Sequence, residues 1–382
     1  MKKLLSLSLT LALLLGLTAC GAQSSAPEAT TSAVSSAETA MPATEEATEP
    51  AVDKLDEMIG KMSLEEKVGQ MFFVRCPDEN AAELAQDYHL GGYVLFGRDF
   101  EGLSEEEVKQ NIRSYQDVSK IPMLIGVDEE GGDVTRVSWY FRDAPFLSPR
   151  EYYAEGGWEA VTSAETEKAE LLNSLGVNVN LAPVCDVTGN EDSFMYSRSF
   201  SGDADEVSEF ASKTVAIYKD KKLGSTLKHF PGYGDNADTH TGVAYDNRSY
   251  SEFLSKDFKP FSAGIKAGAD CVLVSHNIVE CIDDANPASL SDKVHQTLRD
   301  TLGFQGVILT DDLIMEAITD ITGAESAAVA AVKAGNDMLC CSDLENQYPA
   351  VVDAVRNQEI PMPQIDQSVR RVLQWKQDLG LI

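Results

Sequence analysis

The chain has few basic residues for its length. Its 382 residues include 31 Lys and Arg against 62 Asp and Glu, which gives a formal net charge of −31 at pH 7. An acidic excess of this size argues against nucleic acid or an anionic lipid surface as the binding partner. Solubility is the simpler explanation of the charge, and we expect a monomer that binds no nucleic acid.

Three further signals are missing. The seven cysteines show no spacing typical of a zinc site. No GxxxxGK[ST] sequence occurs, so the usual phosphate-binding loop is absent. No internal repeat is apparent, which disfavours a repeat architecture. What the chain does contain is a distinctive N-terminus and a series of polar motifs that follow apolar runs.

The N-terminus has the pattern of a bacterial lipoprotein signal peptide. Lys2 and Lys3 precede an apolar run at 4–17 that is too short for a permanent membrane span. The sequence LTAC at 17–20 resembles a lipobox. We therefore expect residues 1–19 to be removed and Cys20 to be lipidated, which would anchor the protein outside the cytoplasm on the bacterial cell membrane. A plain secretory signal is the alternative.

The segment that follows Cys20 is expected to be a disordered tether. Residues 20–52 are mostly Ala, Ser, Thr, Glu and Pro, with almost no large apolar side chain. Such a segment cannot bury enough surface to offset the entropy of the chain. We expect the folded domain to occupy residues 53–382, a length that is normal for a single α/β barrel.

Short apolar runs alternate with amphipathic segments along this domain. The expected strands are 70–75, 92–96, 123–127, 177–181, 225–228, 271–275, 307–310 and 337–341. The expected helices are 105–120, 160–175, 203–222, 256–267, 292–302, 324–334, 348–357 and 364–379. Continuous apolar strands between helices are typical of a parallel sheet, and eight such units predict a (β/α)8 barrel of the TIM type. A doubly wound open sheet is the alternative.

Charged residues lie at or just past the end of almost every one of these apolar runs. They include Arg75, Arg98, Asp128, Asp186, Lys228, His229, His276, Asp311 and Asp343. Each of them alone is explained as a solvated loop charge. As a set they would converge on one rim of the barrel, which is where the active sites of this fold lie.

The stretch from Lys228 to His240 carries the strongest chemical signal. It places a Lys, two His and two Asp around a Pro-Gly turn, directly after an apolar strand. Asp238 lies two residues before His240. A carboxylate at that spacing can hydrogen-bond one ring nitrogen and prepare the other for proton transfer.

A pair of carboxylates, Asp311 and Asp312, ends another strand. The first should point along the barrel axis, where a carboxylate acts as a nucleophile or stabilises a cation. A metal site built from this pair with Asp238, His240 and His276 is an alternative. No H-x-x-E-H type spacing supports it, and we expect neither a metal nor a cofactor.

A loop with two glycines runs from Asp128 to Arg136. Phosphate binding is disfavoured, because acidic residues surround Gly131 and Gly132 and would repel an anion. The glycines would instead let the backbone bend close to a ligand, with Asp128 accepting hydrogen bonds from hydroxyl groups. The aromatic run 139–141 beyond the loop fits either stacking on a sugar ring or local packing.

Together these segments resemble glycoside hydrolase family 3, and within it the NagZ-type β-N-acetylhexosaminidase branch. The resemblance rests on Lys228-His229-Phe230-Pro231-Gly232, Asp238-Thr239-His240, Asp128-Glu129-Glu130-Gly131-Gly132, Tyr196-Ser197-Arg198-Ser199-Phe200, Thr310-Asp311-Asp312 and Asn180-Leu181-Ala182-Pro183-Val184. It runs from about residue 55 to residue 382. The second sandwich domain of many relatives is expected to be absent.

The resemblance implies a role for each matching residue. Asp311 would be the nucleophile, and Asp238 with His240 would be the acid/base dyad of this branch. The residues that would hold the sugar are Asp128, Arg136, Arg198, Lys228 and His229. The implied activity is exo-acting, retaining removal of terminal N-acetylglucosamine from cell-wall or chitin-type oligosaccharides, through a covalent glycosyl-enzyme.

Some positions depart from the family pattern, and other functions stay open. Tyr233 stands where a His is usual, the loop from Lys228 to His240 is one residue shorter, and Asp133 stands where an Arg is usual. One alternative is a phosphorylase, because a neutral His240 would let phosphate approach where a carboxylate would repel it. The others are another β-glycosidase of the family, acting on glucosides or xylosides, and a non-catalytic carbohydrate-binding lipoprotein.

Overall fold

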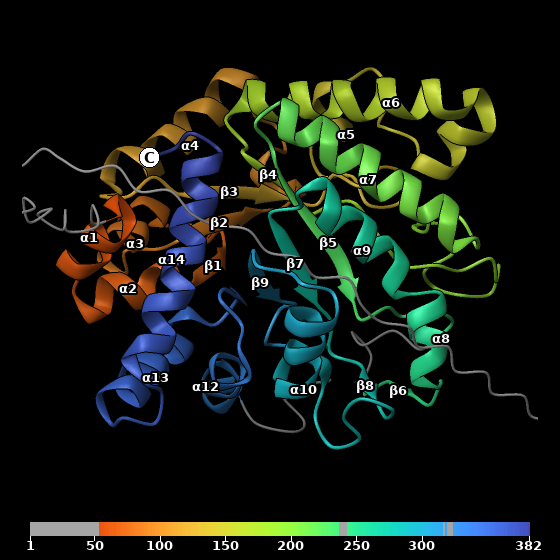
Figure 1. Ribbon diagram of the computed structural model, residues 1–382. Coiled ribbons are helices and arrows are strands. Elements are labelled where there is room, and N and C mark those ends of the chain that lie inside the picture. The colour runs from red at the N-terminus through yellow and green to blue at the C-terminus, as the bar shows by residue number, and fades with distance from the viewer. Residues whose placement is uncertain (1–52, 237–242, 316–317, 319–323) are drawn as a thin grey trace, which may run out of the picture. The chain divides into compact units, whose positions relative to one another are not determined.

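The apolar runs form eight parallel strands joined by helices (Figure 1). The computed structural model describes residues 53–236, 243–315, 318 and 324–382. The strands of the main sheet are β1 (Phe72–Arg75), β2 (Gly92–Leu95), β3 (Leu124–Val127), β4 (Val179–Asn180), β5 (Gly224–Phe230), β7 (Cys271–Val274), β9 (Val307–Thr310) and β10 (Leu339–Cys341). Their order is β10-β1-β2-β3-β4-β5-β7-β9, and every neighbouring pair is parallel.

The two ends of this sheet meet and close it into a barrel. Leu309 of β9 and Met338, just before β10, form a parallel bridge. The amide of Thr310 also donates to the carbonyl of Met338 at 3.2 Å. The ring therefore has no free edge along which another strand could pair. The predicted barrel is confirmed in this sense, and the doubly wound open sheet is excluded.

The helices surround this ring. They are α1 (Lys54–Lys61), α2 (Leu64–Gln70), α3 (Ala81–Asp87), α4 (Glu105–Val118), α5 (Ser138–Phe141), α6 (Pro149–Leu175), α7 (Ala204–Asp220), α8 (Tyr250–Ser255), α9 (Phe258–Ala267), α10 (Asp292–Gln296), α12 (Ala324–Ala334), α13 (Leu344–Arg356) and α14 (Met362–Asp378). Two short strands, β6 (Tyr245–Asp246) and β8 (Ile278–Val279), pair separately. Ser63, Ser104 and Ser148 start α2, α4 and α6 with capping boxes, so the local sequence fixes where these helices begin. Of the helices described, none combines the length and the apolar character that crossing a membrane requires.

Some strand ends differ from the expected ones. β5 includes Lys228 as expected and continues to Phe230, so His229 is part of the strand as well. Its pairing extends that far because the amide of Ser275 donates to the carbonyl of Phe230 at 2.9 Å. The strand expected at 177–181 is reduced to the two residues of β4.

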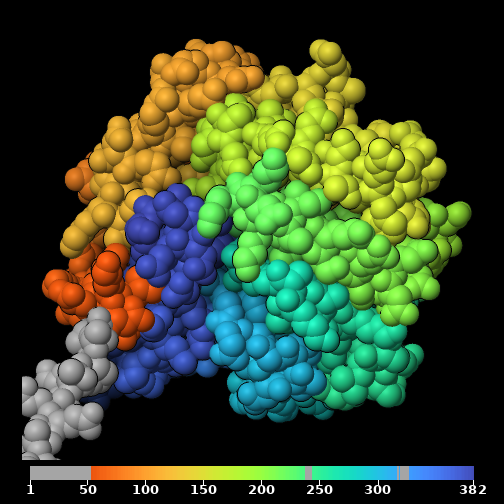
Figure 2. Space-filling view, turned by 45° about the horizontal axis from the view of Figure 1, so that its top comes forward, coloured from red at the N-terminus to blue at the C-terminus, as the bar shows by residue number. Residues whose placement is uncertain are grey.

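The last helix, α14, closes the N-terminal end of the barrel. The barrel interior is filled by Phe73, Val94, Leu124, Val179, Leu181, Cys271, Leu273, Val307, Leu309 and Met338, and Val372 and Trp375 of α14 belong to the same cluster. A Cβ added to Gly224, the first residue of β5, would lie 2.9 Å from the Trp375 ring, so the helix packs directly on the strand. In Figure 1 α14 crosses in front of the sheet, and in Figure 2 the blue C-terminal helices lie against the red N-terminal ones. The opposite, C-terminal rim is therefore the end left for a ligand.

Lys376 of α14 is fully buried at this closed end. Its Nζ donates to Oε1 of Gln70 at 2.6 Å. Burial lowers the pKa of Lys376 from 10.5 to about 7, because the charged form is poorly solvated there. Below about pH 7 the folded protein carries the full cost of burying the charge. That cost shrinks as the pH rises towards 10.5, where the unfolded chain also loses the proton.

Replacing Lys376 with methionine is therefore expected to stabilise the protein, and more so at pH 6 than at pH 10. The linkage relation gives a gain on the order of 3–5 kcal/mol at pH 6, reduced by loss of the hydrogen bond to Gln70. Urea denaturation of both proteins at the two pH values measures it. Lys333→Met is the control, because Lys333 is an exposed lysine paired with Glu359. An equal effect of Lys376→Met at both pH values would contradict the assignment.

Candidate active site

Four of the expected site residues meet at the C-terminal rim of the barrel. Asp128 follows β3, Lys228 and His229 lie in β5, and Arg198 comes from the loop between β4 and α7. Nζ of Lys228 lies 2.5 Å from Oδ1 of Asp128 and 2.6 Å from Oε1 of Glu130. Two carboxylates of the β3 loop thus hold a lysine that belongs to a strand on the other side of β4.

Glu130 is the centre of this cluster. Its buried carboxylate also accepts two hydrogen bonds from Arg198, at 2.9 Å from Nε and 2.7 Å from Nη2. Burial alone would raise the pKa of Glu130, but Lys228 and Arg198 outweigh it and lower that pKa below its ordinary value. Burial alone would lower the pKa of Lys228, and Asp128 and Glu130 reverse this effect. Lys228 and Arg198 therefore both stay charged, and their side chains are held in fixed orientations.

Asp186 orients His229 in the same cluster. Oδ2 of the buried Asp186 lies 2.8 Å from Nδ1 of His229 and accepts the backbone amide of His229 at 3.1 Å. Nη2 of Arg198 lies 3.2 Å from Nε2 of the same ring. Because an arginine only donates, Nε2 accepts and the ring proton is on Nδ1, directed at Asp186. Oδ1 of Asp186 accepts the amide of Tyr233 at 2.7 Å and so fixes the start of the loop beyond β5.

Asp311 lies on the same rim, at the end of β9. Its amide donates to the carbonyl of Val274 at 3.0 Å, and its Oδ1 accepts the amide of Asp312 at 2.9 Å. Cys340 lies on β10, the strand next to β9 in the closed ring. Burial raises the pKa of this thiol, and the carboxylates of Asp312, Asp311 and Asp128 raise it further. Because β3 and β9 are parallel strands of the same closed ring, Asp128 and Asp311 both lie at its C-terminal rim.

His276 supports this strand end from inside the protein. Its ring is fully buried, with Nε2 2.9 Å from the carbonyl oxygen of Asp312 and Nδ1 2.7 Å from Oγ of Ser289. The hydroxyl of Ser342 donates to the Asp312 carboxylate, and burial raises the pKa of Asp312 above its ordinary value. In the portion of the chain that the structure covers, His, Cys, Asp and Glu side chains form no group of three suited to a metal ion.

Arg248 ties together Gly232, Asp246 and Asp257. Arg248 donates to Asp246 at 2.7 Å, to Asp257 at 2.9 Å and to the carbonyl of Gly232 at 3.1 Å. Gly232 has a φ of 119°, and a Cβ there would lie 2.6 Å from Asp257. Only glycine fits this position, because it tolerates the backbone angle and leaves room for the carboxylate.

Comparison with known proteins decides the family. The profile of the "Glycosyl hydrolase family 3 N terminal domain" matches residues 63–375. The chain belongs to glycoside hydrolase family 3. Its relatives include the "Beta-hexosaminidase" of Tolumonas auensis, 31% identical over 283 residues that cover 73% of this chain and 84% of the relative. That of Stenotrophomonas maltophilia is 34% identical over 271 residues, 69% of this chain and 78% of the relative.

Solved structures of this family have the same fold. The glycoside hydrolase family 3 β-N-acetylglucosaminidase from Paenibacillus sp. str. FPU-7 superposes with a TM-score of 0.78 at 30% identity, covering 84% of this chain. This chain spans 63% of that larger protein. M. tuberculosis LpqI superposes with a TM-score of 0.77 at 28% identity, covering 85% of this chain and 96% of the other.

Within this family 3 hydrolase, the other predicted residues lie in different places. Arg136 lies beyond the glycine loop, where its amide donates to Oε2 of Glu129 at 2.7 Å, whereas the ion-pair partners of Lys228 are Asp128 and Glu130. Asp238, His240 and the predicted lipidation site Cys20 lie outside the described residues. Their roles stay predictions.

Sequence reasoning gave no role to Glu130 or Asp186. Both were visible as charges that follow apolar runs, and Glu130 lies two residues after Asp128. Their function depends on partners far away in the chain, since Glu130 binds Arg198 and Asp186 binds His229. Nothing in the local pattern indicated those pairings.

The two glycines of the β3 loop pack against the backbone of residues 146–148. Gly131 has a φ of 100°, and a Cβ there would lie 2.3 Å from the carbonyl oxygen of Leu147. The amide of Gly132 donates to the carbonyl of Phe146 at 2.8 Å. The glycines therefore let this backbone pack closely against residues 146–148 of the protein itself, and the predicted approach of the backbone to a ligand stays a prediction.

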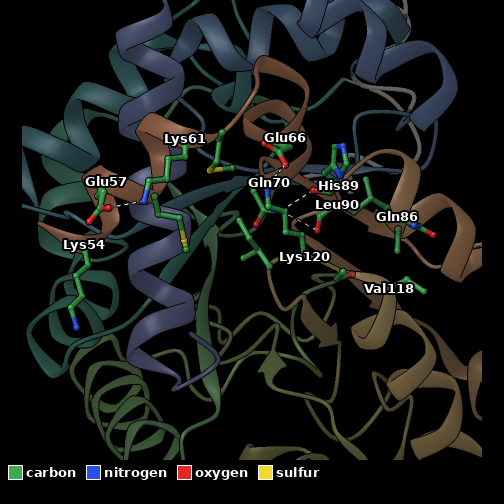
Figure 3. A pocket seen from close by; sticks show the side chains of 15 residues that line it. Lys54, Glu57, Lys61, Glu66, Gln70, Gln86, His89, Leu90, Val118 and Lys120 are labelled. Atoms are coloured by element: carbon green, nitrogen blue, oxygen red, sulfur yellow. Dashed lines mark hydrogen bonds and ion pairs between the residues drawn. The ribbon is translucent and has the colours of Figure 1, made fainter.

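An apolar pocket of about 590 Å³ lies at the other end of the barrel from this site (Figure 3). Met58, Leu90 and Ile121 are among its lining residues. Gln70 and Leu90 precede β1 and β2, so the pocket belongs to the N-terminal ends of the strands. The charged cluster lies at the C-terminal ends, and we therefore assign this pocket no catalytic role.

Proposed function

We propose that this family 3 enzyme is an exo-acting, retaining β-N-acetylhexosaminidase on a (β/α)8 barrel of the TIM type. Its substrates would be cell-wall or chitin-type oligosaccharides with a terminal N-acetylglucosamine. The observation that carries the proposal is the fixed cluster of Asp128, Lys228 and Arg198 on the same open rim as Asp311. The names of the relatives from Tolumonas auensis, Stenotrophomonas maltophilia and Paenibacillus support the sugar class.

The cluster suits a neutral, hydroxyl-rich ligand. Lys228 is almost fully buried, whereas the side chain of Asp128 keeps 21% of its surface exposed towards solvent. Asp128 can therefore accept hydrogen bonds from sugar hydroxyls while Lys228 holds it in position. Arg198 and His229 are already oriented by Glu130 and Asp186, so their binding geometry exists before the sugar arrives.

The mechanism follows from the chemistry of the proposed residues. Ionised Asp311 attacks the anomeric carbon while protonated His240 gives its proton to the leaving oxygen, which produces a covalent glycosyl-enzyme. Asp238 favours the imidazolium form of His240 by charge and hydrogen bonding. Neutral His240 then accepts a proton from water, and this water displaces Asp311 with net retention of configuration.

Replacing His240 with alanine is expected to slow substrates with poor leaving groups most. General acid catalysis is worth on the order of 10²–10⁴-fold, and a nitrophenolate needs little of it. The kcat/KM of an alkyl or saccharide leaving group should therefore fall far more than that of a nitrophenyl glycoside. A parallel loss for both kinds of substrate would show that His240 does not act as the general acid.

A small substrate panel tests the proposed function directly. We expect the purified protein to hydrolyse nitrophenyl β-N-acetylglucosaminide in preference to the matching glucoside and xyloside. Addition of inorganic phosphate distinguishes a phosphorylase, which would release the sugar 1-phosphate. Binding of chitooligosaccharides without any turnover would indicate a carbohydrate-binding protein, and preference for a sugar without the 2-acetamido group would indicate another β-glycosidase.

We further propose that the enzyme is a lipoprotein on the outer face of the bacterial cell membrane, anchored through Cys20. The support is the basic, apolar and LTAC pattern of residues 2–20. Expression in a bacterium that receives labelled palmitate should label the wild type. A Cys20→Ala variant should lose the label and leave the membrane fraction, and an unlabelled wild type would refute lipidation.

A further inference from the structure

We propose that Lys168 of α6 is a positioning residue for the sugar site, because it holds the backbone of the loop that carries Asp128 and Glu130. The inference rests on the proposed glycosidase function and deepens it. Lys168 is almost fully buried behind this loop, and the proposed function gives it no contact with the sugar. Its effect on the reaction would therefore pass through Asp128 and Glu130.

Lys168 forms a buried ion pair with Glu165 of the same helix. Nζ of Lys168 lies 2.7 Å from Oε1 of Glu165, and each residue exposes no more than 2% of its surface. Removing two charges from water is costly, and apolar residues of similar volume often give equal or greater stability. Stability is therefore a weak explanation for a charged pair at this place.

The second hydrogen bond of Lys168 goes to the loop that follows β3. Its Nζ donates to the backbone carbonyl of Glu130 at 2.9 Å. The carboxylate of the same Glu130 binds Lys228 and Arg198. The main chain and the side chain of Glu130 are thus held by cations from three different segments. A shift of the carbonyl would therefore also move the carboxylate that orients Lys228 and Arg198.

Asn180 of β4 holds the neighbouring peptide units of the loop. Its side-chain amide donates to the carbonyl of Glu129 at 3.0 Å, and its Oδ1 accepts the amide of Glu129 at 3.0 Å. Two side chains from other segments, Asn180 and Lys168, therefore bind the backbone from Glu129 to Glu130. Asp128 directly precedes this backbone and follows β3, so its carboxylate extends from a fixed main chain.

Tyr218 of α7 joins these contacts into one network. Its hydroxyl donates to Oε2 of Glu165 at 2.6 Å and accepts from the side-chain amide of Asn180 at 2.9 Å. Burial and the Glu165 carboxylate raise the pKa of Tyr218 well above its ordinary value, so the hydroxyl keeps its proton. The network links β4 and the β3 loop to α6 and α7, which lie side by side in Figure 1. Buried polar networks with satisfied partners favour a single geometry.

The kinetic test separates sugar binding from chemistry. Asp128 and its partners would hold the sugar before and during the reaction, whereas Asp311 belongs to another strand end. We expect Lys168→Met to raise KM for nitrophenyl β-N-acetylglucosaminide about tenfold, the size of one charged hydrogen bond, and to lower kcat by no more than about twofold. The inhibition constant of N-acetylglucosamine, which requires no turnover, should rise by the same factor. An unchanged KM and inhibition constant would overturn the proposal.

A double variant separates positioning from stability. Lys168→Met alone leaves Glu165 as an unpaired buried carboxylate, so it should lower the melting temperature. Adding Glu165→Gln removes that charge and keeps an acceptor for Tyr218, so most of the lost stability should return. We expect KM to stay high in the double variant, because the carbonyl of Glu130 still lacks its cationic donor. Recovery of KM together with the melting temperature would overturn the proposal, since Lys168 would then act through stability alone.

Lys376→Met is the matched control. It is the same substitution of another fully buried lysine, at the opposite, N-terminal end of the barrel. It should change the melting temperature but leave KM and the inhibition constant within twofold of the wild type. A rise in KM as large as that of Lys168→Met would contradict the proposal, because loss of any buried lysine would then have the same effect.

Hydrogen exchange measures the loop without any sugar. The amides of Glu130 and Gly131 donate to the carbonyl of Val134, and the amide of Gly132 donates to the carbonyl of Phe146. These amides should exchange faster in the double variant than in the wild type or Lys376→Met. If the wild type hydrolysed no aryl glycoside, the proposed function would be refuted and the exchange rates would still decide whether Lys168 holds the loop. Normal hydrolysis with unchanged KM and exchange in the double variant would overturn the positioning role and leave the proposed function standing.

Discussion

Replacing Asp311 with alanine is expected to reduce hydrolysis of an aryl β-N-acetylglucosaminide by on the order of 10⁴–10⁶-fold. The carboxylate would form the covalent bond to the anomeric carbon, so its removal eliminates the double-displacement route rather than weakening it. Initial rates at saturating and low substrate give kcat and kcat/KM. Thermal unfolding should show that the variant remains folded.

Two controls make the Asp311 experiment decisive. Asp343 also follows a strand, on β10, and its carboxylate accepts from Asn346 at 2.9 Å; we expect Asp343→Ala to change kcat/KM by no more than a few fold. Azide can replace the missing nucleophile in Asp311→Ala, and the expected product is the α-glycosyl azide. Turnover by Asp311→Ala within tenfold of the wild type would remove this residue from the mechanism.

Replacing Glu130 with glutamine is expected to destabilise the protein by about 3–5 kcal/mol and to lower kcat/KM as well. Glutamine keeps the shape but leaves Arg198 and Lys228 without their shared buried carboxylate, and an unpaired buried charge is costly. The pKa of Glu130 lies below its ordinary value. The stabilisation is therefore present near neutral pH and is lost as the pH falls into strong acid, so wild type and variant should converge there.

The matched control for Glu130 is an exposed ion pair. Glu167 lies 3.0 Å from Arg142, and 55% of its side-chain surface is exposed. Glu167→Gln should change the unfolding free energy by less than about 1 kcal/mol. Denaturant unfolding of both variants provides the comparison. Equal, small losses in the two proteins would show that the Glu130 cluster adds little to stability.

The sequence alone predicted strand ends correctly where the buried residues of the strand are also its apolar residues. The strand at 307–310 was predicted with both ends correct, because four apolar or β-branched residues stand between Gly306 and Asp311. The end of β5 was missed for the opposite reason. His229 is a polar residue inside a buried strand, and its burial is stabilised by Asp186, which comes from a distant segment of the chain.

The same distinction applies to the site. Motifs found Asp128, Lys228 and Arg198, since each has a recognisable neighbourhood in the chain. Glu130 acquires its role through Lys228 and through Arg198, which is 68 residues away. Lys376 is a similar case on the structural side, because lysines are seldom fully buried and the packing of α14 on the barrel base buries this one.

Closure of the ring by the last strand and the last helix bears on how the protein matures. β1 pairs with β10, and Lys376 binds Gln70 across 306 residues of sequence. The barrel therefore cannot be completed on the ribosome until almost the whole polypeptide has been synthesised, and formation of such distant contacts is slow. Such late closure suits the proposed export of this protein, because export machinery threads unfolded chains through a membrane.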